Sequence, residues 1–288
     1  MSAGPSFDAL VAGSGLPRLE ARALLEHASG RSREWLIAHG DEAACPATAD
    51  AFAALAQQRR QGEPLAYLVG WREFHGHRFV VGKGLLIPRA DTEVAVRWAI
   101  DTAPAHGRML DLGTGTGAIA ISVALERPDL DVLATDLSEQ ALDCAQRNAR
   151  HLGAASVSFR LGHWYAALAG QERFDLIVSN PPYLASDDPH LGIGDLRFEP
   201  ALALTDDADG LSALRAIIDG AQGQLKDAGW LGVEHGWQQG APVRALMHAA
   251  GFGKVTTLHD DEARERFTVG QGPSRPHDLA SQGARRVF

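Results

Sequence analysis

Residues 108–119, with the sequence RMLDLGTGTGAI, decide the fold predicted for this chain of 288 residues. Arg108–Leu112 has the apolar character of a short buried strand, and it runs directly into Gly113–Gly117 before the helical run AIAISVALE. Glycines at a strand-to-helix turn tolerate positive φ and let the backbone approach a ligand, while the helix N-terminus presents free N–H groups. We therefore predict a binding site for a polar ligand at this turn.

Strand-like apolar runs alternate with helical patterns along the rest of the chain from Arg108 onward. In chain order, the strand-like runs are MLDL, DVLATD, SVSFRL, FDLIVSN, WLGVEH, KVTTLH and RFTVG. Such alternation is typical of a parallel sheet that helices cover on both faces. The sequence therefore predicts an α/β fold of the Rossmann-like kind.

The first seventy or so residues predict helices separated by residues that start or stop a helix. Pro17 suits a first helical turn, and Gly30 ends the run that follows it. Ser32 can cap the next turn, and a third helix is predicted from Thr48 to Arg60. This part of the chain is a small helical module, too short to hold the rest of the chemistry.

The pattern changes between about Trp71 and Ile87, where a β-hairpin is predicted. Phe79–Val81 are strand formers, Gly82–Gly84 can turn, and Leu85–Ile87 can return as the second strand. The predicted domains are a helical domain at residues 1–70, a β-hairpin linker at 71–90 and an α/β domain at 91–288.

Composition and charge limit the classes of function. Hydrophobic residues at 45% and charged residues at 22% are ordinary for a soluble globular protein, and no apolar run reaches the roughly 20 residues of a membrane span. The N-terminus lacks the pattern of a secretory signal, so a cytoplasmic protein is expected. A net charge of -9 disfavours nucleic-acid binding, which needs clustered Lys and Arg. Cys45 and Cys144 lie far apart and predict neither a disulfide framework nor a metal site.

Two cofactors fit the glycine turn. Asp136, at the end of the next strand, can accept hydrogen bonds from both hydroxyls of a ribose. Gly113-x-Gly115-x-x-Ala118 fits the relaxed dinucleotide fingerprint, so an NAD-linked dehydrogenase is one alternative. S-adenosylmethionine is favoured because Asp111, two residues before the first glycine, can meet the cationic methionine portion of that cofactor.

The motif Asn180-Pro181-Pro182-Tyr183 decides the chemistry. Two prolines remove two backbone donors and stiffen the chain, so the Asn180 side-chain oxygen and the Pro181 carbonyl become rigid acceptors. Two such oxygens suit an NH2 group on a planar, weakly basic nitrogen, whose lone pair can then turn toward a methyl donor. Tyr183 can pack against the flat face of the acceptor group. The motif predicts N-methylation that depends on positioning and electrostatics and needs no dedicated base.

These motifs together resemble the PrmC/HemK family, the release factor glutamine methyltransferases. The resemblance rests on LGTGTGAI at residues 112–119, Asp136, GHW at residues 162–164 and NPPY at residues 180–183. It continues through GEPLAYLVGWREFHGHRF at 62–79, LIPRADTE at 86–93, LRFEPALAL at 196–204 and DGLSALRAI at 209–217. It therefore covers nearly the whole chain.

The resemblance implies a class I methyltransferase fold with a seven-stranded sheet and S-adenosylmethionine as cofactor. It also implies N5-methylation of the glutamine in the Gly-Gly-Gln motif of class 1 peptide chain release factors, with substrate binding by residues 1–70 and methyl transfer by residues 91–288. A monomer with no direct nucleic-acid or membrane contact is expected. Two alternatives stay open: a methyltransferase for a nucleic-acid amino group, adenine N6 or guanine N2, and a non-catalytic protein that binds release factors or ribosomes.

The site residues follow from the motifs and from the resemblance. The predicted cofactor-binding residues are Asp111, Gly113, Thr114, Gly115, Thr116, Gly117, Asp136, Leu137, Trp164 and Asn180. The predicted substrate-binding residues are Asn180, Pro181, Pro182, Tyr183, Arg89 and Glu93. The predicted catalytic residues are Asn180, Pro181 and Tyr183, with Asn180 beside both the methyl group and the target glutamine. The residues whose individual roles stay open are Arg89, Thr92, Glu93, His163, His190, Glu234 and His235.

Three residues depart from the family pattern: His163 stands where an acid is usual, Ala90 where proline is usual, and His75 where a bulky aromatic is common. His75 and His77 would share one face of the chain if this segment is an extended strand, which is one way to begin a metal site. No third ligand is apparent in the sequence, so no metal is predicted.

Overall fold

The computed structural model describes residues 4–274, whose contacts divide into two compact units. The first unit comprises the described residues up to Arg72 together with Val80–Ile87 and Pro189–Pro200. The second comprises Glu73–Phe79, Pro88–Asp188 and the described residues from Ala201 onward. The domain boundaries expected near residues 70 and 90 stay a prediction. Within residues 4–274, no helix has the length and apolar character needed to cross a membrane.

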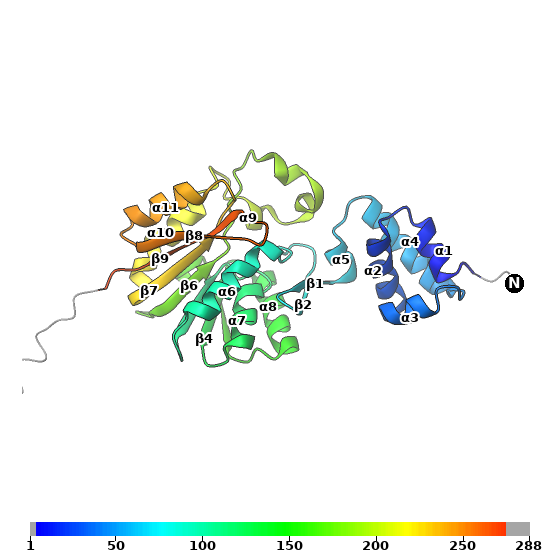
Figure 1. The fold of residues 1–288 in the computed structure, drawn as a ribbon, viewed down its shortest axis with the longest axis horizontal. Coiled ribbons are helices and arrows are strands. Elements are labelled where there is room, and N and C mark those ends of the chain that lie inside the picture. Colours follow the sequence, from blue (N-terminus) through cyan, green and yellow to red (C-terminus); the bar gives the residue numbers. More distant parts are fainter. Residues whose placement is uncertain (1–3, 275–288) are drawn as a thin grey trace, which may run out of the picture. The chain divides into compact units, whose positions relative to one another are not determined.

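The first unit begins with a set of short helices (Figure 1). They are α1 (Phe7–Gly13), α2 (Arg18–Ser29), α3 (Arg33–Ala38), α4 (Pro46–Arg60) and α5 (Leu65–Val69). The predicted helix after Pro17 is confirmed as α2, which ends at Gly30 in the left-handed conformation. The predicted cap is also confirmed, because the Ser32 hydroxyl accepts a hydrogen bond from the Trp35 N–H at 3.3 Å. The third predicted helix begins earlier than expected, since Pro46 fits its first turn.

Apolar side chains on the inner faces of these helices form the core of the first unit. The largest buried members are Phe7, Leu24, Leu25, Leu36 and Phe52. Burying each such side chain contributes about 1.5–3 kcal/mol. The 3₁₀ helices η3 (Pro189–Gly192) and η4 (Gly194–Phe198) belong to the same unit, although they lie far along the sequence.

The predicted hairpin exists, but its predicted turn is wrong. Its strands are β1 (Trp71–Phe74) and β2 (His77–Val80), joined at His75 and Gly76, whose φ angles are 47° and 74°. Two consecutive residues with positive φ make a tight turn whose twist suits a hairpin. Leu85–Ile87 does not form the expected second strand. Because His75 lies in the turn, it does not share a strand face with His77.

The second unit is built on a seven-stranded sheet, which confirms the predicted strand number. Its strands are β3 (Arg108–Leu112), β4 (Asp131–Asp136), β5 (Val157–Leu161), β6 (Phe174–Ser179), β7 (Leu225–Glu234), β8 (Gly253–His259) and β9 (Glu265–Gln271). Their order is β5-β4-β3-β6-β7-β9-β8. Strands β3 to β7 pair in parallel, as expected. The predicted parallel arrangement does not hold for β9, which runs antiparallel to both β7 and β8 because a short turn joins it to β8.

Helices cover both faces of this sheet, as predicted (Figure 1). One face is covered by α6 (Glu93–Thr102), α7 (Ala118–Glu126) and α8 (Glu139–Leu152), and the other by α10 (Ser212–Gln224) and α11 (Gly240–Ala249). The second unit also contains the short helix α9 (Ala201–Leu204) and the 3₁₀ helices η1 (Ala90–Thr92) and η2 (Trp164–Ala167). Successive strand residues point to opposite faces. Met109 therefore packs in one core with α6 and α7, while its neighbour Leu110 packs in the other with α10 and α11.

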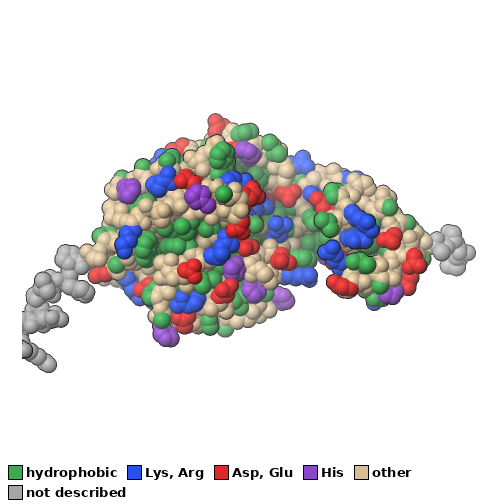
Figure 2. Space-filling model, in the orientation of Figure 1, with side chains coloured by type: hydrophobic (Ala, Val, Ile, Leu, Met, Phe, Trp, Pro, Cys, Tyr) green, Lys and Arg blue, Asp and Glu red, His purple; other side chains and the backbone are tan. Residues whose placement is uncertain are grey.

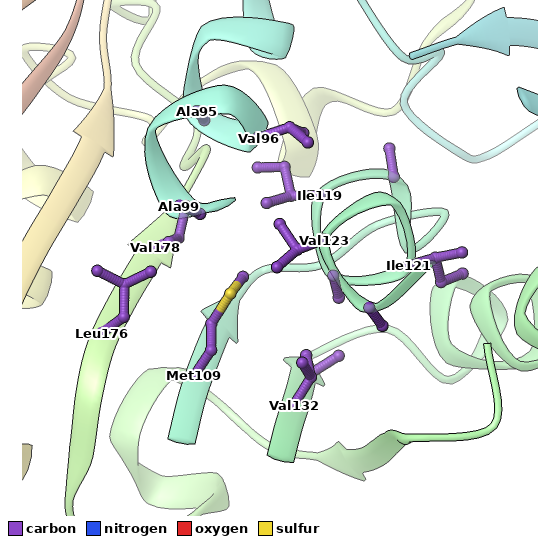
Figure 3. Close-up of a cluster of buried hydrophobic side chains, with 14 of the residues drawn as sticks. Ala95, Val96, Ala99, Met109, Ile119, Ile121, Val123, Val132, Leu176 and Val178 are labelled. Carbon is purple, nitrogen blue, oxygen red and sulfur yellow. The ribbon is translucent and has the colours of Figure 1, made fainter. Parts of the chain in front are cut away.

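Figure 3 shows how tightly the first of these two cores joins helix to sheet. Its labelled side chains come from α6 (Ala95, Val96, Ala99), α7 (Ile119, Ile121, Val123) and the strands β3, β4 and β6 (Met109, Val132, Leu176, Val178). Each of these side chains exposes 5% of its surface or less. Helix α7 is therefore held firmly on β3, and the glycine turn that joins them has two fixed ends.

Candidate active site

Four parallel strands bring the predicted site residues to one edge of the sheet. The residues at their ends are in register: Leu112 with Thr135, Leu112 with Ser179, and Ser179 with Val233. The residues that follow are Gly113, Asp136, Asn180 and Glu234. This edge includes β3, on either side of which the strand order diverges, and ligands of α/β sheets bind outside the carboxyl ends at such a point.

The glycine turn combines open space with tight packing. Gly115 has φ of +58°, and a Cβ added to it would meet no atom within 4 Å. Gly117 has φ of +84°, and its Cβ would lie 2.5 Å from Cδ1 of Ile121. Positive φ disfavours a side chain at both positions. At Gly117 the side chain would also crowd Ile121, whereas at Gly115 it would fill space that a ligand can use.

Asp111 lies in β3, two residues before Gly113, and its side chain hydrogen-bonds to the glycine turn and to the helix that follows it. Its Oδ2 accepts hydrogen bonds from the Thr114 hydroxyl at 2.7 Å and from the Ala120 N–H at 3.3 Å. Its Oδ1 is buried and has no hydrogen-bond partner among the described residues. Burial raises the pKa of Asp111 to about 7, although the bonds from Thr114 and Ala120 oppose this. A cation beside Oδ1 would stabilise the ionised carboxylate.

Asp136 ends β4 and binds the turn directly. Its Oδ2 accepts from the Gly115 N–H at 2.8 Å, and its Oδ1 accepts from the Ser138 N–H at 2.9 Å. Each carboxylate oxygen can accept more than one hydrogen bond, so both keep capacity for ligand hydroxyls. Burial raises the pKa of Asp136. The next residue, Leu137, leaves 50% of its surface exposed at this edge.

Trp164 lies against the glycine turn. A Cβ added to Gly113 would approach its Cζ3 atom to 3.3 Å. The Trp164 backbone has φ of 45°, an uncommon value for a residue other than glycine, at the start of η2. The ring of His163 lies next to it, with 5.4 Å between ring centroids. The turn is thus bordered by an aromatic side chain that can contact a flat ligand.

Asn180 follows β6, and its amide group is anchored by a residue from far back in the chain. Its Nδ2 donates a hydrogen bond to Oγ1 of Thr92 at 3.1 Å. Thr92 is buried, with 4% of its surface exposed. Within residues 4–274, no donor reaches Oδ1 of Asn180. That oxygen therefore stays available to accept a hydrogen bond from a ligand.

Tyr183 is held at both its ring and its backbone. Its hydroxyl donates to Oε1 of Glu234 at 3.2 Å, and its carbonyl accepts from Nε2 of Gln239 at 3.0 Å. The same Gln239 amide also donates to the Gly210 carbonyl at 3.1 Å. Burial raises the pKa of Tyr183, so its hydroxyl keeps the proton that it donates to Glu234. The chain after the two prolines is thus fixed to the end of β7.

Glu234, which accepts from Tyr183, belongs to a group of charged side chains that also includes Arg266, Asp91 and Asp260. Glu234 exposes 1% of its surface, and burial raises its pKa to about 7 against the effects of the Thr92 hydroxyl and the Arg266 charge. The Arg266 guanidinium pairs with Asp91 at 2.9 Å and with Asp260 at 3.4 Å. Arginine is rarely buried without a partner, and these two carboxylates supply that partner.

Glu234 gives a testable pH dependence of stability. A carboxyl whose pKa is higher in the folded than in the unfolded state favours folding when protonated, so its ionisation between about pH 4.5 and pH 7 lowers the free energy of unfolding. The charges facing it are Arg266 and Asp91, and the Thr92 and Tyr183 hydroxyls hydrogen-bond to it. All four groups remain in the Glu234→Gln variant. Urea unfolding at about pH 5 and about pH 8 should show the wild type losing about 2–3 kcal/mol more than this variant. Equal losses in both proteins would show that Glu234 ionises normally.

The two other predicted substrate-binding residues, Arg89 and Glu93, flank η1. The Glu93 carboxylate accepts from the His75 N–H at 3.0 Å, at the hairpin turn. Arg89 is half-buried and directly precedes η1, and its carbonyl accepts from the Thr92 N–H at 3.1 Å. Contact of Arg89 or Glu93 with substrate stays a prediction.

The structure thus gathers most of the predicted residues at one edge: the glycine turn with Asp111, Asp136, Leu137, Trp164 and the segment Asn180–Tyr183. Thr114 and Thr116 are both buried within the turn, and Pro181 is buried next to Asn180. Sequence reasoning missed the pairing of Arg266 with Asp91 and Asp260. The available signal was the single arginine within the apolar run RFTVG.

His235 makes hydrogen bonds within the second unit. His235 is buried, its Nε2 lies 2.7 Å from Oγ1 of Thr268, and burial lowers its pKa. The described part of the chain contains no group of three or more His, Cys, Asp or Glu side chains placed to hold a metal ion.

Comparisons with protein families match both parts of the chain. Residues 95–269 match the family model described as methyltransferase small domain. Residues 10–70 match the one described as PrmC N-terminal domain.

Known proteins and solved structures are similar over most of the chain. The release factor glutamine methyltransferase of Xylella fastidiosa (strain Temecula1 / ATCC 700964) is 52% identical, over 93% of this chain and 99% of that protein. The protein of the same name from Bordetella pertussis is 52% identical, over 91% of this chain and 97% of its own length. The crystal structure of a methyltransferase from Pyrococcus furiosus has a TM-score of 0.54 at 15% identity, over 75% of this chain and 98% of that one. At that identity the likeness shows the fold alone.

Proposed function

The chain belongs to the release factor glutamine methyltransferase family, and on this premise we propose that it methylates the side-chain amide of a glutamine in class 1 peptide chain release factors. The target is the glutamine of the Gly-Gly-Gln motif, and the methyl donor is S-adenosylmethionine. The observation that carries the proposal is the hydrogen bond from Asn180 to Thr92, 3.1 Å long. It leaves the Asn180 oxygen free to accept from an amide NH2 group.

The residues at the sheet edge fit S-adenosylmethionine. The unpartnered Oδ1 of Asp111 suits the cationic methionine portion, and the open space at Gly115 suits a ligand close to the backbone. Asp136 would bind the ribose hydroxyls. Leu137 and Trp164 would contact the adenine, which would also cover the exposed surface of Leu137. When bound, this cofactor supplies an electrophilic methyl group on a sulfonium centre.

The chain's own residues would act by holding the glutamine amide. An amide nitrogen is a poor nucleophile because its lone pair is delocalised. The Asn180 Oδ1 and the Pro181 carbonyl would accept its two N–H bonds, and the lone pair would then turn out of the amide plane toward the methyl group. The fixed ring of Tyr183 would pack on the flat face of the amide. Positioning and preorganised electrostatics would supply most of the rate enhancement.

The finer assignments of partner and place are part of the same proposal. Residues 1–70 would bind the release factor, and residues 91–288 would carry out methyl transfer, with the enzyme acting as a cytoplasmic monomer. Direct nucleic-acid binding is not expected. Figure 2 supports this for the face that it shows, where Lys and Arg side chains are interspersed with Asp and Glu. The pI of about 5.7 gives the same support.

Transfer of labelled methyl groups to purified release factor tests this function. We expect the wild-type enzyme to label an intact class 1 release factor and to leave unlabelled a release factor whose Gly-Gly-Gln glutamine is replaced by alanine. That substitution removes the acceptor nitrogen and leaves the rest of the protein unchanged. Equal labelling of both substrates would rule out the proposal. Labelling of DNA or RNA with steep salt dependence would favour a nucleic-acid methyltransferase instead.

A further inference from the structure

Three consecutive side chains at the start of α6 are fixed by three different parts of the second unit. Asp91 pairs with Arg266 of β9 at 2.9 Å. Thr92 accepts from Nδ2 of Asn180 at 3.1 Å. The Glu93 carboxylate accepts from the backbone of the hairpin turn at 3.0 Å. Because its neighbours on both sides are anchored, the Thr92 hydroxyl is held in one place at the site.

The Thr92 hydroxyl has one hydrogen to donate and lone pairs to accept with. Since Nδ2 of Asn180 is the donor to its oxygen, its own hydrogen needs another acceptor in this buried position. That acceptor is the buried carboxyl of Glu234, to which the Thr92 side chain hydrogen-bonds. Oε1 of Glu234 also accepts from the Tyr183 hydroxyl at 3.2 Å. With its hydrogen directed to Glu234, Thr92 offers Asn180 only an acceptor.

This one-sided contact matters because an asparagine amide can take two nearly isosteric orientations that exchange its oxygen and nitrogen. With Nδ2 toward Thr92, Oδ1 is left for the ligand. In the reversed orientation two oxygens, Oδ1 and Oγ1, would face each other without a hydrogen between them, and an NH2 group would face the ligand's NH2. Only the first orientation can bind the acceptor that the reaction needs.

We propose that Thr92 is a positioning residue for methyl transfer, which fixes the Asn180 amide with its oxygen toward the acceptor nitrogen while Glu234 holds the hydrogen of the Thr92 hydroxyl away. This role rests on the proposed function. Thr92 acts through Asn180 and does not itself touch the substrate. A substitution that removes its hydroxyl should therefore change turnover more than binding.

The kinetic test compares Thr92→Val, which keeps the shape, with Thr92→Ser, which keeps the hydroxyl. At saturating S-adenosylmethionine, Thr92→Val should lower kcat for release factor methylation by about 10- to 100-fold, with KM and cofactor affinity changed by much less. Thr92→Ser should recover most of the lost turnover. The matched control is Thr268→Val, another buried threonine that loses hydrogen bonds, to His235 and Thr257, outside the Asn180 contacts. It should be destabilised to a similar degree and keep its kcat.

The amide orientation can also be measured without turnover. Asn148 and Asn180 are the only asparagines in the sequence, so labelling asparagine with nitrogen-15 gives two side-chain NH2 signals. The spectrum of the Asn180→Ala variant lacks one of the two signals, and the missing signal is assigned to Asn180. In Thr92→Val, solvent exchange of the Asn180 NH2 should become about tenfold faster or more. Asn148 should not change, because its Nδ2 donates to the Thr116 carbonyl at 2.9 Å.

The two readouts separate this inference from the proposed function. If the wild type methylates release factor and Thr92→Val has wild-type kcat and wild-type Asn180 exchange, the positioning role is wrong and the function stands. If the wild type methylates no release factor, the function fails, and the exchange experiment still decides whether Thr92 holds Asn180. A kcat loss that Thr92→Ser does not recover, or that Thr268→Val shares, would also contradict the positioning role.

Discussion

Replacing Asn180 with alanine is expected to lower kcat for release factor methylation by about 100- to 1,000-fold. The Asn180 oxygen is the acceptor that would hold the glutamine NH2, and the hydrogen bond to Thr92 keeps it pointed at the ligand. Alanine removes this acceptor at the reacting nitrogen and leaves the glycine turn and Asp136 in place. Single-turnover methylation at saturating cofactor and release factor measures the effect on the transfer step.

The chain's other asparagine supplies a contrast to this variant. Asn148 is buried in α8 and donates to the Thr116 carbonyl within the glycine turn. Asn148→Ala should therefore reduce stability and cofactor affinity more than kcat. For Asn180→Ala, calorimetry should find cofactor affinity changed by less than about tenfold, since one contact beside the methyl group is lost. A collapse of cofactor affinity in Asn180→Ala would mean that its main role is to bind cofactor.

The parts of the fold that could be predicted from the sequence depend on neighbouring residues. Ser32 caps α3 through the N–H of Trp35, three residues away, and Gly30 ends α2 by its own conformation. The turn Gly113–Gly117 likewise needs only its own glycines and the strand and helix that flank it. Where one short stretch of residues determines the local geometry, that geometry can be predicted from the sequence of the stretch. The cofactor side of the site falls in this class.

The other side of the site is made by contacts between residues far apart in sequence. Thr92 and Asn180 are separated by 88 positions, and Tyr183 and Glu234 by 51. The sequence marked Thr92 and Glu234 as members of family-like segments but gave neither a partner. Tyr183 meets Glu234 because β6 and β7 are neighbours in the sheet, and Thr92 meets Asn180 because α6 packs on this sheet. For that reason the acceptor oxygen could be predicted, while the group that orients it could not.

The two errors of secondary structure have local physical causes. The hairpin turns at His75 and Gly76, which offer one glycine, whereas Gly82–Gly84 offers two and was the stronger turn signal. Strand β9 has the same apolar pattern in either direction, and a period of two residues carries no information on polarity. Its antiparallel pairing with β7 follows from the short connection that leads out of β8.

Replacing Asp136 with alanine is expected to weaken S-adenosylmethionine binding by about 100-fold or more. The carboxylate would accept hydrogen bonds from two ribose hydroxyls, and each bond to a charged acceptor contributes about 1.5–3 kcal/mol. It also accepts from the Gly115 N–H at 2.8 Å, so the variant loses an anchor of the glycine turn together with the ribose contact. Calorimetric titration of the purified variant with S-adenosylmethionine measures the loss.

Asp143→Ala is the matched control, because Asp143 is an exposed acid on α8, the helix that follows Asp136. It should bind cofactor like the wild type. At cofactor concentrations high enough to saturate Asp136→Ala, turnover should return to within about tenfold of wild type, since the acceptor oxygen of Asn180 is untouched. This pattern is the reverse of that expected for Asn180→Ala. Together the two variants would assign cofactor binding to Asp136 and binding of the glutamine amide to Asn180. Unchanged cofactor affinity in Asp136→Ala would place the ribose elsewhere and remove the reason for assigning S-adenosylmethionine to this turn.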